Sequence, residues 1–210
     1  MNFTSPISVI IPVAKDETEH RGLVKFFETL SDPQIEVITA SGNSRANALN
    51  NGAKKAIGDF LWFIHADTKI QPVHIEKLKS TLEKSPNKIH YFDLAFEQTA
   101  PVYMRLNAFG ANMRSRLGFP WGDQTYCIKK ENLAKIGYFD ESLSYGEDHA
   151  LILKSRMMNI KLNRIPHKVI TSAREYKNSG WLRLTLQRQC IWPILTIKLW
   201  RKYSKEYRAK

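Results

Sequence analysis

The stretch that decides the fold is Phe60-Leu61-Trp62-Phe63-Ile64-His65-Ala66-Asp67-Thr68, in which five bulky apolar residues precede a short polar end. Such a run has no polar face, so it predicts a strand buried on both sides, as strands of a parallel sheet are. Asp67 then follows the carboxyl end of the strand, where open α/β sheets bind ligands, and its oxygen atoms can hold a divalent cation. The alternative is that Asp67 only caps the helix that follows Pro72.

Strand-like and helix-like segments alternate ahead of this stretch. β-Branched residues over 7–11 predict a first strand, and apolar residues at helical spacing follow it; 35–40 predicts a second strand before a helix that Ser44 can cap. This alternation predicts parallel strands joined by right-handed crossovers, a nucleotide-binding arrangement of the Rossmann kind. Neither Gly-x-Gly-x-x-Gly nor a Walker lysine motif follows the first strand, which disfavours ordinary dinucleotide and P-loop chemistry.

The rest of the chain continues with elements of both kinds. We expect helices over 72–83, 101–117 and 131–136, strands over 89–96 and 125–129, and two short strands over 162–165 and 169–172. Glu147 and Asp148 fall in the first turn of a further helix, where free backbone N–H groups and the helix dipole stabilise carboxylates. That position alone can explain both acids.

Composition and charge describe a globular protein with an anionic partner. The chain has 210 residues, 43% hydrophobic and 25% charged, and its two cysteines have no metal or redox spacing. These values predict one well-buried domain in a reducing compartment. We expect no signal peptide and no membrane span, and therefore a cytoplasmic protein. The formal net charge of +12 implies nucleic acid, phospholipid or a phosphorylated substrate as partner.

The C-terminal segment carries much of that charge. From Trp181 onward eight basic residues stand against Glu206 alone, and Trp192 and Trp200 add to a wide apolar stripe. We therefore divide the chain into a domain over 1–179 and a basic amphipathic helical tail over 180–210. The tail can lie in the headgroup layer of an anionic membrane, bent at Pro193, which predicts a peripheral protein on the inner face of the plasma membrane. Packing on the protein's own core or on a second subunit is the alternative.

Six segments resemble, in order and spacing, motifs of the family 2 glycosyltransferases, which move a sugar from a nucleotide-sugar to an acceptor. They are 7–12, 44–53, 58–68, 122–124, 146–148 and 171–174. His65-Ala66-Asp67 stands where most members carry Asp-x-Asp, a variant found in a subgroup of bacterial enzymes. The resemblance implies an α/β protein of the GT-A fold, a Rossmann-like arrangement with a mixed, mainly parallel sheet flanked by helices.

The resemblance also implies roles for the acids. Asp67 would contact Mg²⁺ or Mn²⁺ bridging the diphosphate, and the cation would stabilise charge on the departing nucleoside diphosphate. Asp148 would be the general base for the acceptor hydroxyl, and Glu147 would orient the site. One base without an enzyme nucleophile implies a single displacement with inversion at the sugar carbon. His65 could be a neutral metal ligand, although a structural histidine is the more ordinary reading.

Several further residues are expected at the donor. Arg45 and Arg174 would bind phosphate oxygens, and Asp123 and Gln124 would bind sugar hydroxyls; surface ion pairs and a structural turn are the alternatives. The usual Asp-Gly after the second strand is absent, so the nucleotide stays open. Lys15-Asp16-Glu17 replaces the usual Asn-Glu. The residues expected to contact the nucleotide-sugar are Pro12, Ala14, Asp16, Arg45, Asp67, Asp123, Gln124 and Arg174.

Two other functions stay open beside an inverting glycosyltransferase. A nucleotidyltransferase would share the sheet and the metal-bound acids, although its glycine-rich, lysine-containing loop after the first strand is absent. A non-catalytic protein would use the basic tail on nucleic acid or membrane, with a steep salt dependence on DNA. For the transferase we expect a nucleotide-sugar donor, a lipid or lipid-linked acceptor, an anionic membrane surface and no nucleic acid. An oligomer is left open.

Overall fold

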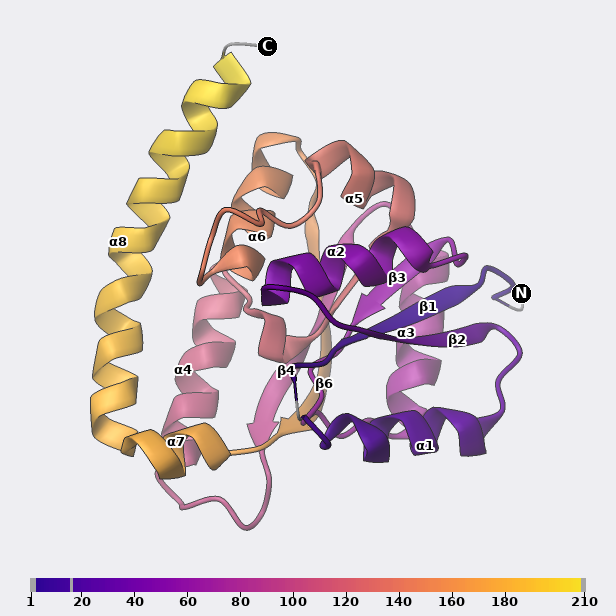
Figure 1. Cartoon of the computed structure of the whole chain (residues 1–210), viewed down its shortest axis with the longest axis horizontal. Coiled ribbons are helices and arrows are strands. Elements are labelled where there is room, and N and C mark those ends of the chain that lie inside the picture. The colour runs from indigo at the N-terminus through magenta and orange to yellow at the C-terminus, as the bar shows by residue number, and fades with distance from the viewer. Residues whose placement is uncertain (1–2, 16, 209–210) are drawn as a thin grey trace.

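The structure is a computed structural model that describes residues 3–15 and 17–208 (Figure 1). Its strands form one sheet in the order β2-β1-β3-β5-β4-β6. β5 is antiparallel to both β3 and β4, and the other pairs are parallel, which confirms the expected mixed, mainly parallel α/β sheet. The strands are β1 (Ile7–Pro12), β2 (Ile35–Ala40), β3 (Phe60–Phe63), β4 (Ile89–Phe96), β5 (Tyr126–Lys129) and β6 (Leu162–Thr171).

Helices cover both faces of the sheet because its strands are apolar on both sides. α1 and α3 pack on the face that carries Val9 and Trp62, whereas α2, α5 and α6 pack on the face that carries Ile10 and Leu61. The helices are α1 (His20–Leu30), α2 (Arg45–Lys55), α3 (Pro72–Lys84), α4 (Met104–Arg116), α5 (Lys130–Ile136), α6 (Glu147–Met157), α7 (Arg174–Ser179) and α8 (Trp181–Arg208), with a 3-10 turn, η1, over Gly122–Gln124.

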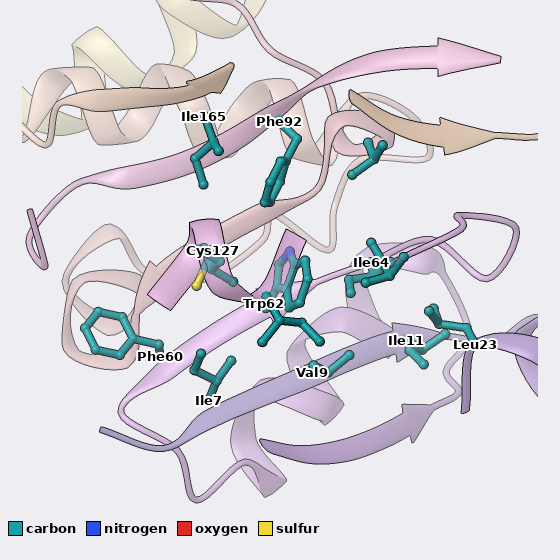
Figure 2. Close-up of a cluster of buried hydrophobic side chains, with 14 of the residues drawn as sticks. Ile7, Val9, Ile11, Leu23, Phe60, Trp62, Ile64, Phe92, Cys127 and Ile165 are labelled. Carbon is teal, nitrogen blue, oxygen red and sulfur yellow. The ribbon is translucent and has the colours of Figure 1, made fainter. Parts of the chain in front are cut away.

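Trp62 is the centre of the larger core cluster (Figure 2). Its side chain is fully buried, and its ring lies 6.1 Å from the rings of both Phe27 and Phe92. The indole N–H donates a 3.1 Å hydrogen bond to Thr125 Oγ1, so the one polar atom of this side chain is satisfied. The predicted buried strand is therefore confirmed, although its regular part ends at Phe63 and the next residues form a turn.

β4 pairs with β6 along its whole length, but the short β5 leaves its other edge without a strand partner beyond Tyr91. β5 pairs only with His90 and Tyr91 of β4. Beyond that point Asn112 of α4 accepts from the Leu94 N–H at 2.8 Å and donates to the Leu94 C=O at 3.0 Å. Gln124 Nε2 donates to the Phe92 C=O at 3.1 Å. Side-chain amides thus complete the backbone pairing of a buried strand edge, which is costly to leave unpaired.

Two sequence expectations about elements were wrong. The segments around Pro166-His167-Lys168 form one strand, β6, in which the register shifts between Phe92 and Asp93 of the partner strand. Pro166 has no N–H to donate, so the chain bulges there and then resumes pairing. The helix expected from Pro101 begins at Met104, after a turn.

The C-terminal helix packs on the domain along one side. Leu199 and Tyr203 of α8 are buried against Ala150 and Leu153 of α6. Asp140 fixes this contact, because it accepts hydrogen bonds from Lys202 Nζ and Tyr203 Oη, both at 2.7 Å. α8 continues through Pro193. Among the described residues no helix combines the length and apolarity that crossing a bilayer requires.

Candidate active site

A pocket of about 760 Å³ lies beyond the carboxyl ends of the parallel strands. Residues of the segments 12–15, 42–45, 65–67 and 171–174, which follow β1, β2, β3 and the end of β6, line one part of it. Asp123 and Asp148 line the part formed by η1 and α6. The fold therefore brings Asp67 and Asp148, 81 positions apart in sequence, to one pocket, as open α/β sheets do with ligand-binding residues.

Asp67 is held by the end of the last strand. Its Oδ2 accepts a 3.0 Å hydrogen bond from Thr171 Oγ1, and the Lys69 N–H donates to the Ile170 C=O at 2.7 Å. Gln71 is the residue that caps α3, so capping does not explain Asp67. Burial raises the pKa of Asp67, and the hydrogen bonds from Thr171 and Ser172 only partly oppose this. A carboxylate in that situation is stabilised by a cation beside it.

The donor set fits a metal ion that is shared with a substrate. Within residues 3–15 and 17–208 no three His, Cys, Asp or Glu side chains gather into a complete metal site. Mg²⁺ is commonly bound through one or two carboxylates together with phosphate oxygens of the substrate. Asp67 supplies one hard oxygen donor at the pocket, which suits that mode of binding.

Asp148 is positioned by backbone donors. Its Oδ2 accepts a 2.6 Å hydrogen bond from the Gly122 N–H, and its Oδ1 accepts one of 2.7 Å from the His149 N–H. A Cβ atom on Gly122 would lie 2.5 Å from Arg45 Nη2, 2.8 Å from His65 Nε2 and 2.9 Å from Asp148 Oδ2. Because Gly122 has no side chain, its backbone can donate to Asp148 without displacing these side-chain ends.

Arg45 links the loop after β3 to the first turn of α6. Its Nη1 lies 3.0 Å from Glu147 Oε1, and its Nη2 contacts His65 Nε2. Burial, followed by the charge of Arg45, places the pKa of His65 well below its usual value, so the imidazole is neutral. Burial also raises the pKa of Glu147, with Arg45 opposing and Asp148 adding to the shift. Glu147 is thus a buried partner of Arg45, consistent with an orienting position.

The other predicted residues differ in where they lie relative to the pocket. Pro12, Ala14, Asp123 and Arg174 line the pocket. Arg174 is paired with Glu17 at 3.6 Å and Glu19 at 2.5 Å, the surface ion pairs that the sequence left open. Burial raises the pKa of Asp123, as does Asp148, while Arg114 opposes the shift. Asp16 lies outside the described residues.

Gln124 does not reach the pocket, contrary to the sequence expectation. It is fully buried and its amide is bound to the backbone of Phe92 and Trp121. The reason is the unpaired edge of β4, which needs a donor at that place. The turn over Gly122–Gln124 therefore gives one residue to the pocket, one backbone donor to Asp148 and one side chain to the core.

The sequence expectations missed the part of the pocket that α8 builds. Arg188, Trp192 and Leu195 line the pocket, and their spacing of four and three residues places them on one helical face. Gly146, in the left-handed region with φ 80°, caps α6 beneath this face, and a Cβ there would lie 2.5 Å from Leu195 Cδ2. That helical spacing was visible in the sequence, but it did not show which surface the face covers.

Comparisons with known proteins find solved structures of similar fold. A crystal structure of S. aureus TarS in complex with UDP-GlcNAc is similar over 80% of this chain and 58% of that chain, with 14% identity and a TM-score of 0.54. Another S. aureus TarS structure gives 13% identity, 80% and 36% coverage and a TM-score of 0.57. The crystal structure of a mycobacterial protein is similar over 80% of this chain and 65% of that chain, with 13% identity and a TM-score of 0.56. This chain thus spans less than two thirds of those chains.

These likenesses confirm the GT-A fold. No curated protein matches the sequence. The family described as Glycosyl transferase family 2 matches residues 11–132, more than half of the chain, and this match includes Arg45, Asp67 and Gly122. The chain belongs to glycosyl transferase family 2.

Proposed function

We propose that the protein is a nucleotide-sugar glycosyltransferase that inverts the configuration of the transferred sugar. The observation that carries the proposal is that Asp67 and Asp148 line one pocket, the first after a buried strand and the second in the first turn of α6. If the diphosphate of the donor is held near Asp67, the attached sugar would point toward Asp148. The reaction needs a general base on the side of the acceptor hydroxyl and charge stabilisation on the side of the leaving group.

Asp148 is the base in this proposal. The N–H groups of Gly122 and His149 hold its carboxylate, and it takes the proton of the acceptor hydroxyl as that oxygen attacks the anomeric carbon. Arg45 and Arg174, two of the cations that line the pocket, would bind phosphate oxygens. Asp123 would accept hydrogen bonds from sugar hydroxyls. Since Glu147 is buried against Arg45, its part is to hold that guanidinium in place.

Asp67 would hold Mg²⁺ or Mn²⁺ together with diphosphate oxygens. The cation, when bound, stabilises charge on the departing nucleoside diphosphate. His65, in the His-Ala-Asp variant of the motif, contacts Arg45 through Nε2, so we assign it to positioning Arg45 and not to the metal. From the His65-Ala66-Asp67 motif we propose that the chain belongs to the bacterial subgroup that carries His-Ala-Asp.

For the acceptor we propose a lipid or lipid-linked molecule. α8 lines the pocket with Trp192 and Leu195, an apolar wall beside Arg188. The opposite side of the same helix carries exposed basic residues, each of which contributes about 1 kcal/mol near an anionic membrane. The protein would then work peripherally on the inner face of the plasma membrane.

A thermal-shift panel of nucleoside diphosphates, nucleotide-sugars and nucleoside triphosphates, with and without Mn²⁺, tests the proposed function. One diphosphate and its nucleotide-sugar should raise Tm only with Mn²⁺, and Asp67→Asn should abolish the metal dependence. Asp148→Asn should keep donor binding and lower transfer about 10²- to 10⁴-fold. The control is Asp59→Asn, an exposed carboxylate at the other end of β3. Pyrophosphate release from a triphosphate, or full transfer by Asp148→Asn, would contradict the proposal.

A further inference from the structure

Exposed apolar side chains are concentrated on two segments of the described chain. Among the residues that the structure describes, thirteen large hydrophobic ones are exposed, and all but Ile57 and Tyr145 lie in 102–117 or 182–200. Several are more than 60% exposed, including Leu106, Phe109 and Ile194. Large exposed apolar patches mark interaction sites, whereas single scattered apolar residues are ordinary on a protein surface.

The two segments are neighbours in space. α4 and α8 run side by side at the edge of the molecule (Figure 1), and Asn107 of α4 joins them. It donates to Thr185 Oγ1 at 3.0 Å and accepts from Trp181 Nε1 at 3.1 Å. The rings of Tyr103 and Trp181 lie 4.5 Å apart at the same end. The exposed residues of α4 and α8 therefore belong to two helices that are bound to each other.

On each helix the apolar residues form a stripe. Positions three, four or seven residues apart return to one helical face, which is the pattern of an amphipathic helix. We define the α4–α8 surface by these exposed side chains: Leu106, Phe109 and Met113 of α4 with Val102 and Leu117 just outside its two ends, and Leu182, Leu186, Ile194, Ile197 and Trp200 of α8.

Cations without counter-charges accompany these stripes. No acidic residue occurs in 98–122 or in 176–205. Several exposed basic residues on these helices make no ion pair with any described residue: Arg105, Arg116, Arg183, Lys198, Arg201 and Lys205. An apolar stripe bordered by cations matches the headgroup layer of an anionic bilayer, with phosphates above and acyl chains below.

We propose that the α4–α8 surface docks on an anionic lipid bilayer, with α4 inserting as well as α8. Charge decides between this partner and a second copy of the chain, because a symmetric dimer would bring two cationic surfaces together. The apolar stripes disfavour nucleic acid as the partner, because its charged backbone cannot bury ten exposed apolar side chains. Docking in this way places the bilayer one helix diameter, about 10 Å, from the face of α8 that lines the pocket. It does not depend on the reaction proposed above.

Sedimentation of the full chain with sucrose-loaded vesicles tests the docking. Vesicles of phosphatidylcholine with phosphatidylglycerol should bind the protein, and pure phosphatidylcholine should bind it far more weakly. Leu106→Ser with Phe109→Ser should lower the partition coefficient about tenfold or more, since two exposed side chains no longer enter the lipid. Arg201→Glu with Lys205→Glu should lower it about 30-fold or more.

Matched controls separate docking from general effects. Ile57→Ser removes an even more exposed apolar side chain elsewhere, and Arg21→Glu with Lys25→Glu reverses two cations of the same spacing on α1. Both should sediment with anionic vesicles like the unmodified protein. Met113→Ser with Leu117→Ser changes the same stripe at two other positions. It should show the same loss of vesicle binding, and it replaces the first variant if that one does not fold.

Three outcomes would overturn the proposal. Unchanged binding by both α4 variants would mean that the tail alone reaches the lipid. Equal binding to phosphatidylcholine and to anionic vesicles would remove the role of charge. A dimer in analytical ultracentrifugation that the α4 variants dissociate, without lipid binding, would assign the surface to a second copy. Donor binding at the pocket, measured separately, would be unaffected in each case.

Discussion

The Gly122 N–H donates a 2.6 Å hydrogen bond to Asp148 Oδ2, and this bond ties the turn before β5 to the first turn of α6. The two residues come from segments 26 positions apart. The bond fixes the carboxylate that we assign as base, while the absent side chain leaves room for Arg45 and His65. A single glycine thus sets the relative positions of three polar groups at the pocket.

Changing Gly122 to Ala should damage the site more than the fold. The new Cβ would meet Arg45, His65 and Asp148 at 2.5–2.9 Å, so these side chains must move. Displacing a base by about 1 Å can cost about 100-fold in rate, so transfer should fall by that order. Gly22→Ala in α1, with nothing within 4 Å, is the control and should gain about 0.5–1 kcal/mol in stability. Transfer at the normal rate in Gly122→Ala would show that the position of Asp148 is not critical.

Gln124 and Asp123 should separate stability from ligand binding. Gln124→Ala leaves the buried Phe92 C=O without its donor and should cost about 1–3 kcal/mol in a urea titration, with donor affinity unchanged. Asp123→Asn should alter ligand affinity without lowering stability, because burial already disfavours the charged carboxylate. The opposite pattern, with Gln124→Ala stable and unable to bind donor, would return Gln124 to the pocket.

Buried histidines should make the protein less stable in mild acid. Burial lowers the pKa of His90 to about 4, as it does for His149, and His90 Nε2 lies 2.9 Å from the Ser85 C=O. Between about pH 6.5 and pH 4, His90 binds a proton in the unfolded chain but stays neutral in the folded protein. Its stabilising contribution is therefore complete above pH 6.5 and lost as pH falls toward 4, by about 3 kcal/mol at most.

Urea titrations of the unmodified protein and of His90→Gln, at several pH values from about 7.5 to about 4.5, measure this contribution. The difference in unfolding free energy between the two should shrink as pH falls. Comparing the two proteins removes the opposite effect of Asp67, Asp123 and Glu147, whose raised pKa values are common to both. A difference that stays constant with pH would show that His90 is not protected from protonation.

Local patterns predicted most of the fold. The apolar run before Asp67 and the Ser44 cap appear as expected, with Ser44 Oγ accepting from the Asn47 N–H at 3.1 Å. The bulge at Pro166 was not predictable in the same way. It depends on how β6 registers against β4, and a strand written alone does not reveal its partner.

The site was predictable as far as it follows strand ends and helix starts. Asp67 and Asp148 occupy such places, so topology brings them to one pocket. The expectation that Gln124 contacts the donor was wrong because the surroundings of Gln124 depend on the length of β5, which is a property of the whole sheet. Arg188 and Trp192 were missed because an amphipathic helix shows that it has an inner face without showing what that face covers.

Anomalous diffraction from crystals grown with Mn²⁺ and the nucleoside diphosphate that raises Tm tests the central claim most directly. The account predicts a manganese peak at the Asp67 carboxylate, a diphosphate bound to that ion, and the Asp148 carboxylate facing the diphosphate across the same pocket. A diphosphate bound with manganese elsewhere, or with Asp148 turned away from it, would contradict the account.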